Sequence, residues 1–256
     1  MKHKGKIFKT NSCGEVVILN YINYRNVYIK FLDTGYETVK SFGNIQAGAV
    51  MDRLRPTVYN VGVIGEGNIS NGNILLKEYR LWNSMLQRCY DNKLHEECPT
   101  YTECVVSDNF KYFPYFKEWC LNQVGFGLKD DKGKPFALDK DILVKGNKVY
   151  SEDNCTFVPR EINNVFLKGK KSRGDNFIGV NYHTRDKVFA SNISKFGHQH
   201  HLGYFNTEME AFYAYKQAKE DYIKEVAEKW KDQIDPRVYE AVMKDEVDIN
   251  DRHTSR

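Results

Sequence analysis

The spacing of the apolar residues changes twice along this chain of 256 residues, and the changes divide it into three units. In residues 1–62, short runs such as VVILNY and NVYIKF alternate with turn-forming segments that contain Gly, Asn and Asp. Short β-branched and aromatic runs joined this tightly predict strands that curl into a small β-barrel. Residues 63–76 have little apolar periodicity and many Gly and Asn residues, and they predict a linker.

The second unit, residues 77–166, begins with helical spacing. Its first apolar residues recur every three or four positions, which predicts an amphipathic helix. The segment FKYFPYFKEWCLNQVG predicts a second, aromatic helix with Pro114 in its first turn. From Phe136 to Phe166 the pattern predicts a strand, a turn at Gly146-Asn147, another strand and a short helix. The residues that define the first helix are Tyr79, Trp82, Met85, Leu86 and Tyr90.

The third unit, residues 177–231, returns to strands and ends in a long helix. IGVNYH, VFASNIS and HHLGYF predict three strands. Thr207 and Glu210 have the spacing of a capping box and predict where the helix begins. A basic linker, 167–176, precedes this unit, and an acidic tail, 232–256, follows it. The predicted fold class is a multidomain α+β protein. One apolar face of the helix would contain Ala211, Ala214, Tyr215, Ala218 and Tyr222.

Charge is distributed unevenly along the chain, although its total is small. Lys and Arg number 38 and Asp and Glu number 34, which gives a net charge of +4. Residues 166–205 contain seven basic and two acidic side chains, whereas residues 206–256 contain nine basic and thirteen acidic ones. A basic segment beside a small sheet is the electrostatic footprint of phosphate contact. A solvated, lysine-rich linker is the alternative interpretation of the same charges.

Apolar runs and cysteines indicate the compartment. No window approaches 18 apolar residues and the N-terminal segment is charged, so neither a membrane-spanning helix nor a secretory signal is predicted. Six cysteines without a Cys-x-x-Cys pair predict a reduced, cytoplasmic protein. A zinc site with irregular spacing is the alternative for part of this set. Its ligands would be Cys89, Cys98, Cys104, Cys120 and His95.

About ten positions of the third unit follow the order of a DNA-binding family. Over residues 176–227 they resemble the Apetala/ethylene-response-factor domain. The resemblance implies a three-stranded antiparallel sheet that lies in the major groove of DNA, with a helix packed behind it. The family's usual Trp or Phe is Phe189 here, and its usual Ala is Ser191. The matching positions are Gly179-Val180, Phe189-x-Ser191-x-Ile193, Leu202-Gly203-x-Phe205-x-Thr207, Glu210-Ala211 and Ala214-Tyr215.

Strand alternation assigns the two faces of this sheet. It places Phe189, Ser191 and Ile193 against the helix, and it places Ala190, Asn192 and Ser194 outward. Arg side chains can bind guanine edges, and Asn or Gln can bind adenine edges. By the resemblance, the residues that would contact double-stranded DNA are Asn181, His183, Arg185, Lys187, Asn192, Ser194, Gln199, His201 and Tyr204, and the basic linker would add Lys168, Lys170, Lys171 and Arg173.

A histidine-rich run, Gly197-His198-Gln199-His200-His201, lies between the last two predicted strands. We interpret it as an exposed hairpin turn, with a metal site as the alternative.

The middle unit contains acidic and amide residues in a second recognisable order. Asp139 and Asn154 are 15 positions apart, and Asn154 and Asn163 are 9 apart. With the upstream aromatic helices, this order resembles phage-borne HNH nucleases. The resemblance implies a ββα unit that binds Mg²⁺ or Mn²⁺ through Asp139 and Asn163, with Asn154 steadying the catalytic base. The motif residues are Leu138-Asp139-Lys140-Asp141, Tyr150-Ser151-Glu152-Asp153-Asn154-Cys155, Ile162-Asn163-Asn164, Trp82, Met85, Arg88-Cys89 and the Phe116–Trp119 segment.

Phage proteins of this kind commonly carry an appended DNA-binding domain, often of the Apetala type. The N-terminal segment from Phe31 to Tyr36, F-x-D-T-G-Y, is also similar to segments of such proteins and of Tudor-like barrels.

One position departs from the HNH pattern, because Lys140 stands where the family has its catalytic histidine. An ordinary lysine, with a pKa of about 10.4, is protonated at neutral pH and does not accept a proton. The remaining catalytic assignments are Asp141 as a substitute base or metal ligand, and Lys140 as a phosphate-binding or transition-state-stabilising cation. The alternative is that Asp139, Asn154 and Asn163 are turn and cap residues of an inactive fold.

Three functions remain open from the sequence. The first is a homing-type endonuclease that cuts or nicks duplex DNA with Mg²⁺ or Mn²⁺ in the cytoplasm of an infected bacterial host. The second is a catalytically inactive relative that binds DNA as a repressor or competitor. The third is an anti-defence factor that binds another protein through the N-terminal barrel.

Overall fold

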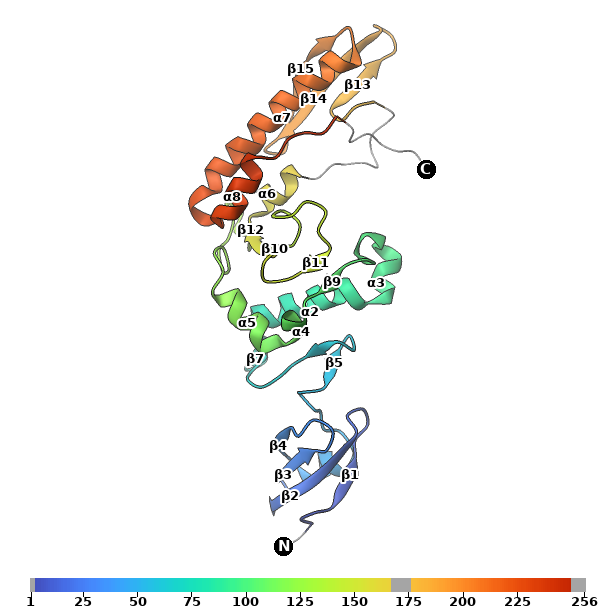
Figure 1. Ribbon diagram of the computed structural model, residues 1–256, viewed down its shortest axis with the longest axis vertical. Coiled ribbons are helices and arrows are strands. Elements are labelled where there is room, and N and C mark those ends of the chain that lie inside the picture. The colour runs from blue at the N-terminus through green and yellow to red at the C-terminus, as the bar shows by residue number, and fades with distance from the viewer. Residues whose placement is uncertain (1–2, 167–175, 250–256) are drawn as a thin grey trace. The chain divides into compact units, whose positions relative to one another are not determined.

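The computed structural model describes residues 3–166 and 176–249, and its α+β composition agrees with the fold class predicted from the sequence (Figure 1). The chain divides into two compact units. The first contains Met1–Leu121 and Lys148–Glu152, and the second contains Asn122–Asn147 and Asp153–Arg256. Across the described ranges, no helix combines the length and apolar character needed to cross a membrane.

The N-terminal sheet has four antiparallel strands in the order β1-β2-β3-β4. Alternate side chains of β2 and β3 point inward and form most of its core, and Ile45 of α1 packs against them. The buried strand residues are Val16, Ile18, Val27, Ile29 and Phe31. The elements are β1 (Ile7–Lys9), β2 (Glu15–Asn23), β3 (Asn26–Phe31), β4 (Glu37–Lys40) and α1 (Phe42–Gln46).

The prediction that these strands close into a barrel is wrong, because the sheet is open among the described residues. β1 and β4 form its edges, and each pairs with one neighbour only. β1 has three residues and β4 has four, so the edge strands are too short for the tilt and stagger that closure requires. Ile45 and Val50, which follow β4, complete the core instead.

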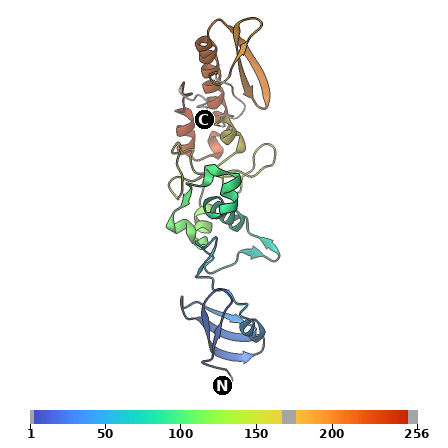
Figure 2. The ribbon, with the colours of Figure 1, turned by 90° about the vertical axis from the view of Figure 1, so that its right-hand side faces the viewer.

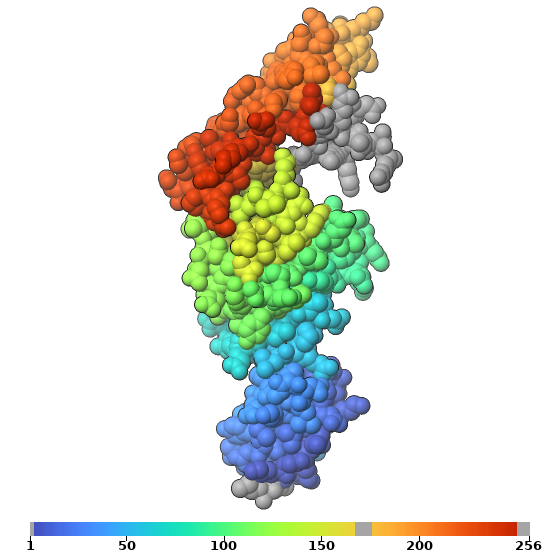
Figure 3. Space-filling model, in the orientation of Figure 1, coloured from blue at the N-terminus to red at the C-terminus, as the bar shows by residue number. Residues whose placement is uncertain are grey.

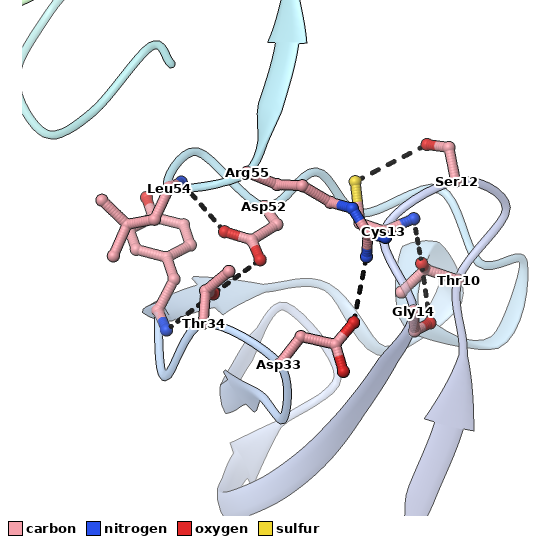
Figure 4. Close-up of polar contacts among 10 residues, drawn as sticks. Thr10, Ser12, Cys13, Gly14, Asp33, Thr34, Asp52, Leu54 and Arg55 are labelled. Atoms are coloured by element: carbon pink, nitrogen blue, oxygen red, sulfur yellow. Dashed lines mark hydrogen bonds and ion pairs between the residues drawn. The ribbon is translucent and has the colours of Figure 1, made fainter. Parts of the chain in front are cut away.

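A buried carboxylate fastens the segment after α1 to the sheet (Figure 4). Asp52 is fully buried, and it accepts hydrogen bonds from Thr34 Oγ1 at 2.6 Å and from the Leu54 N–H at 2.9 Å. Close by, Arg55 forms an ion pair with Asp33 at 3.0 Å. A buried charge requires such donors, so these contacts fix the path of the chain as it leaves the sheet.

Aromatic helices form the rest of the first unit, as the sequence predicts. α2 (Lys77–Tyr90) buries Trp82, whose indole N–H donates to the Phe110 carbonyl at 2.7 Å. α5 (Phe113–Leu121) has Pro114 in its first turn. Short strands pair β5 with β6, β7 with β8, and β9 with β11. The other elements are α3 (Asn92–Glu97), α4 (Asp108–Lys111), a 3₁₀ turn (Pro99–Tyr101), β5 (Pro56–Val58), β6 (Gly62–Val63), β7 (Ser70–Asn71), β8 (Ile74–Leu75), β9 (Val105–Val106) and β11 (Val149–Tyr150).

The second unit begins with a two-stranded sheet and a short helix. β10 (Ala137–Asp139) pairs antiparallel with β12 (Thr156–Val158), and α6 (Arg160–Val165) follows. The strands do not form a tight hairpin, because residues 140–155 connect them. Within that connection, a hydrogen bond from the Asn147 N–H to the Val144 carbonyl at 3.0 Å closes the expected Gly-Asn turn. The β10–β12 register sets Asp139 opposite Thr156.

The C-terminal sheet is antiparallel in the order β13-β14-β15, and α7 lies along one of its faces (Figures 1 and 2). The predicted capping box is confirmed, because Thr207 Oγ1 accepts from the Glu210 N–H and the Glu210 carboxylate accepts from the Thr207 N–H. Ala211, Tyr215 and Tyr222 of the predicted apolar face are buried. The elements are β13 (Val180–His183), β14 (Val188–Lys195), β15 (His198–Phe205), α7 (Glu208–Trp230), a 3₁₀ turn (Lys231–Gln233) and α8 (Pro236–Met243).

Gly179 allows the chain to enter β13 directly against α7. Its φ is +78°, and a Cβ added there would lie 2.0 Å from the Tyr215 ring. Gly197 has a similar φ of +85°, but a Cβ there would meet nothing within 4 Å. Substitution at either glycine would strain the backbone, but only substitution at Gly179 would also cause a steric clash.

We predict that Gly179→Ala destabilises the protein more than Gly197→Ala. A left-handed backbone costs an Ala about 1–2 kcal/mol, and both variants carry that cost. Only Gly179→Ala adds the clash with Tyr215. Urea unfolding followed by circular dichroism measures the difference, and equal losses in the two variants would contradict the close approach of β13 to α7.

Candidate functional site

Asp139 stands at the end of β10, where its carboxylate organises the start of the connection to β12. Its Oδ1 accepts the N–H groups of Asp141 at 2.9 Å and Ile142 at 2.8 Å. Burial raises the pKa of Asp139, and the charge of Asp141 and a hydrogen bond between the two carboxyl groups act in the same direction. The two backbone N–H donors oppose this shift. Two carboxyl groups are therefore held close together in a partly desolvated place.

Asn163 on α6 lines the same cavity as these carboxyl groups. The cavity measures about 590 Å³. The Oδ1 atom of Asn163 is buried, and no described group donates a hydrogen bond to it. Buried polar atoms nearly always have a partner, so an unpaired acceptor here points to a bound water or ion. The pairing of β10 with β12 explains the proximity, because α6 begins two residues after β12 ends.

Acidic residues after α8 form another part of the cavity wall. Asp245, Glu246 and Asp248 join Asp139 and Asp141, so five carboxyl side chains line the cavity with two lysines, Lys145 and Lys219. Figure 3 shows the red residues after α8 packed on the orange surface of α7. Such an excess of carboxylates attracts cations and repels a bare phosphate.

Contacts with α7 and with the β10–β12 connection hold this acidic segment. The Val247 N–H donates to Glu220 Oε1 at 3.0 Å, and Lys216 Nζ donates to the Val247 carbonyl at 3.0 Å. Lys145 Nζ forms an ion pair with Asp245 at 3.0 Å.

Lys219 brings a desolvated cation to the cavity wall. Burial lowers the pKa of Lys219, and the carboxylate of Asp245 opposes that shift. A desolvated ammonium facing carboxylates is suited to contact a phosphate once part of the negative charge is neutralised.

Lys140, Asn147 and Asn154 form a hydrogen-bond network within the same connection. Lys140 Nζ donates to the Asn147 carbonyl at 3.0 Å, and Asn147 Nδ2 donates to the Lys140 carbonyl at 2.6 Å. Asn154 Nδ2 donates to Asn147 Oδ1 at 3.4 Å. Lys140 Nζ also lies 3.5 Å from Asp141. Lys140 thus acts as a donor that braces the loop, and Asn154 reaches it through Asn147.

Oxygen donors from three residues suit a hard divalent cation. Asp139 and Asp141 offer carboxylate oxygens, and Asn163 offers its unpaired amide oxygen. This set fits Mg²⁺ or Mn²⁺ better than zinc, which prefers nitrogen and sulfur. Within residues 3–166 and 176–249, no three or more His, Cys, Asp or Glu side chains gather in a metal-binding arrangement.

The absence of such a group among the described residues applies both to the possible zinc site of cysteines with His95 and to the possible metal site in the histidine-rich run. Cys89, Cys104 and Cys120 are buried in the first unit, and Cys98 is half-buried. His95 Nε2 lies 2.8 Å from the Arg88 carbonyl. The residues His198, His200 and His201 are exposed on β15.

The face of the C-terminal sheet that points away from α7 presents polar and aromatic side chains. Asn192 is half-buried, and its Oδ1 lies 3.1 Å from His201 Nδ1. The rings of His183 and His201 lie 5.4 and 4.6 Å from the ring of Tyr204. The other predicted contact residues of the sheet, Asn181, Arg185, Lys187, Ser194 and Gln199, are exposed.

Ala190 was expected to face outward, yet it is buried, because its methyl group is short and lies between the paired residues Asn181 and Tyr204. The linker residues Lys168, Lys170, Lys171 and Arg173 lie outside the described residues.

Sequence reasoning missed Lys219 and the carboxylates of residues 245–248. Lys219 lies 80 positions after Asp139, in a segment whose pattern indicates only a helix. The carboxylates lie 106 to 109 positions after Asp139, in a segment whose pattern indicates only a tail. No spacing rule connects them with β10.

Comparisons of the chain with protein-family models, with curated proteins and with solved structures find no match. The function is therefore argued from the residues and their geometry.

We predict that Asp139→Asn stabilises the protein at neutral pH. The folded-state pKa of Asp139 is raised, so its ionised form weakens the fold above the ordinary carboxyl pKa of about 3.9. Asn keeps an oxygen that can accept from Asp141 and Ile142. We expect the variant to melt about 2–4 °C above the wild type at pH 7, with a smaller difference as the pH falls toward 4.

Thermal denaturation at several pH values measures this effect. Asp186→Asn is the matched control, because Asp186 is exposed on the same unit. A wild type that is more stable than Asp139→Asn at pH 7 would contradict the desolvated carboxyl pair.

Proposed function

We propose that the protein is a metal-dependent nuclease of HNH type that binds duplex DNA and nicks or cuts it, and that it acts in the cytoplasm of a phage-infected bacterium. The observation that carries this proposal is the unpaired Oδ1 of Asn163 in the same cavity as Asp139 and Asp141. Asp139 and Asn163 are the positions that the HNH resemblance assigns to the metal. The strand, strand and helix that carry them follow the order of a ββα unit.

Asp139 and Asn163 would hold a divalent cation, with Asp141 beside them. Bound Mg²⁺ or Mn²⁺ would polarise the phosphate and neutralise the charge that develops on it. The five carboxyl groups of the cavity make this neutralisation necessary, since they would otherwise repel DNA.

Asp141 is the residue best suited to accept a proton in this site. Its side chain is 49% exposed, so water can reach it, whereas Lys140 is a donor and only 11% exposed. In the proposed step, a water oxygen attacks phosphorus, its proton passes to Asp141, and the P–O bond to the leaving oxygen breaks. Lys219 would contact the phosphate, and the Lys140–Asn147–Asn154 network would keep the loop in place.

The C-terminal sheet would bind the duplex. Arg185 and Lys187 of the exposed β13–β14 turn would contact phosphates or guanine edges, and the exposed strand residues Asn181 and Gln199 would contact adenine edges. A three-stranded antiparallel sheet with α7 along one face is the arrangement that the Apetala resemblance implies, and it supports this part of the proposal.

A catalytically inactive DNA-binding relative is the second candidate, and Lys140 favours it. A lysine at this position removes the family's histidine base, while the sheet would still bind DNA as a repressor or competitor. An anti-defence role through the N-terminal sheet rests on exposed side chains such as Ile22, Tyr24 and Tyr28, which offer a surface to a protein partner.

We predict that the protein nicks supercoiled plasmid in the presence of Mg²⁺ or Mn²⁺ and that EDTA abolishes the reaction. Asp139→Ala should reduce nicking by at least about a hundredfold, because it removes a metal ligand. Agarose gels of plasmid and phage genomic DNA measure the conversion. Asp232→Ala serves as the control and should remain active, because Asp232 is exposed in the same unit and lines neither the cavity nor the sheet.

The two candidates give different results in this assay. Metal-dependent nicking that Asp139→Ala abolishes supports the nuclease. Salt-sensitive duplex binding without cleavage in either metal would contradict the nuclease and support the inactive relative. Absence of both at about 50 mM salt, where phosphate contacts are strongest, would contradict both.

We predict that removing Arg185 and Lys187 weakens duplex binding and lowers its salt dependence by about two phosphate contacts. Lys187 has a φ of +53°, so the double variant Arg185→Ala with Lys187→Asn avoids strain that Ala would add. Fluorescence anisotropy with labelled duplex at several salt concentrations measures both effects. Lys4→Ala with Lys6→Ala, two exposed cations of the first unit, is the control. Unchanged affinity in the Arg185 and Lys187 variant would contradict docking through the sheet.

A further inference from the structure

A second cavity of about 740 Å³ lies within the second unit, on another side of α6. Its walls are the turn at 130–134, residues of α6 between Arg160 and Val165, α7 from Tyr215 onward, and the end of β14 with the Phe196–Gly197 tip of the β14–β15 hairpin. Tyr215, Lys219 and Val165 line both this cavity and the Asp139 cavity. The proposed nuclease chemistry uses none of its other residues.

The acidic side chains of this cavity are already bound. Asp130 Oδ1 accepts the N–H groups of Lys132 at 3.0 Å and Lys134 at 2.8 Å, which forms the turn. Asp131 and Glu161 both pair with Lys229, at 2.6 and 2.7 Å. Glu161 also accepts from the indole N–H of Trp230 at 2.7 Å.

Three cations remain available around the rim. Lys132, Lys134 and Arg160 are exposed, and no carboxylate in the described part of the chain pairs with their side chains. With its acids engaged, the cavity therefore presents positive charge to a ligand.

Phe196 adds an exposed aromatic ring to the same wall. It is 47% exposed, and its φ is +51°, a conformation that Gly or Asn adopts more easily in a hairpin turn. Its N–H donates to the Tyr222 hydroxyl at 3.0 Å, and the two rings meet edge to face, with their centroids 5.0 Å apart and their planes at 82°. Lys229 Nζ lies 5.8 Å from the centroid of the Phe196 ring. The backbone of the turn does not favour a phenylalanine here, because Gly or Asn would adopt this φ with less strain.

We propose that this cavity binds a single nucleic-acid strand. Lys132, Lys134 and Arg160 contact its phosphates, and one base stacks on the exposed face of Phe196. Cations that follow a backbone, together with an aromatic platform, are the features by which proteins hold unpaired strands. The inference goes beyond the proposed duplex binding, and it requires neither the metal nor the β13–β15 surface.

The test is fluorescence anisotropy of the full chain with labelled dT15 at about 50 mM salt and above. Phe196→Asn suits the turn, so it should fold at least as stably as the wild type, yet bind dT15 about 5- to 150-fold more weakly. Lys132→Ala with Lys134→Ala should lower the salt slope by about 1.4. Tyr213→Ala is the aromatic control, since Tyr213 is 56% exposed on α7 and does not line the cavity.

The outcomes separate this inference from the proposed function. Arg185→Ala with Lys187→Asn should keep its affinity for dT15 while losing affinity for duplex. A wild type that binds dT15 but no duplex would support the single-strand cavity and contradict duplex docking. The inference is overturned if dT15 does not bind, if Phe196→Asn binds like the wild type, or if the Arg185 and Lys187 variant loses dT15 as strongly as Phe196→Asn.

Discussion

The turn that begins at Asp139 is the constraint on which the candidate site depends. One carboxylate oxygen accepts two successive N–H groups, from Asp141 and Ile142, at the point where β10 ends. This arrangement fixes the carboxyl group of Asp139 and brings that of Asp141 beside it. Because β10 pairs with β12, the same turn also faces α6 and the unpaired Oδ1 of Asn163. The arrangement combines two mutually repelling carboxyl groups with an unpaired amide acceptor.

The electrostatics of the cavity explain why catalysis and DNA binding would depend on a cation. Five carboxyl groups face two lysines, so a phosphate meets a repulsive field until positive charge enters. Lys140 does not line the cavity: its ammonium group donates to the Asn147 carbonyl and lies 3.5 Å from Asp141, so it offsets part of the charge of that one carboxylate. Lys219 of α7 does line the cavity, and it could not be predicted from the sequence because it is 80 positions from Asp139. Helix α7, which packs on the sheet proposed to bind DNA, thus also contributes to the candidate catalytic cavity.

Local sequence patterns predicted the helices and strands. The features that could not be predicted depend on contacts between residues far apart in the sequence. The capping box of Thr207 and Glu210 and the burial of Trp82 follow from spacing within one helix, and both are observed. Barrel closure depends on whether the first and last strands meet, which no local pattern encodes, and here the sheet stays open. The predicted positions Asp139 and Asn163 do line one cavity. The contact of Lys145 with Asp245, 100 positions away, could not be read from spacing.

A crystal grown with Mn²⁺ and measured at the manganese absorption edge tests the central claim most directly. The account predicts an anomalous peak bound by Asp139 and by Oδ1 of Asn163, at about 2.1 Å from each oxygen. It also predicts that Asp139→Asn removes that peak. A peak that forms only elsewhere, or an Asn163 Oδ1 bonded to a protein donor with no metal beside it, would contradict the account.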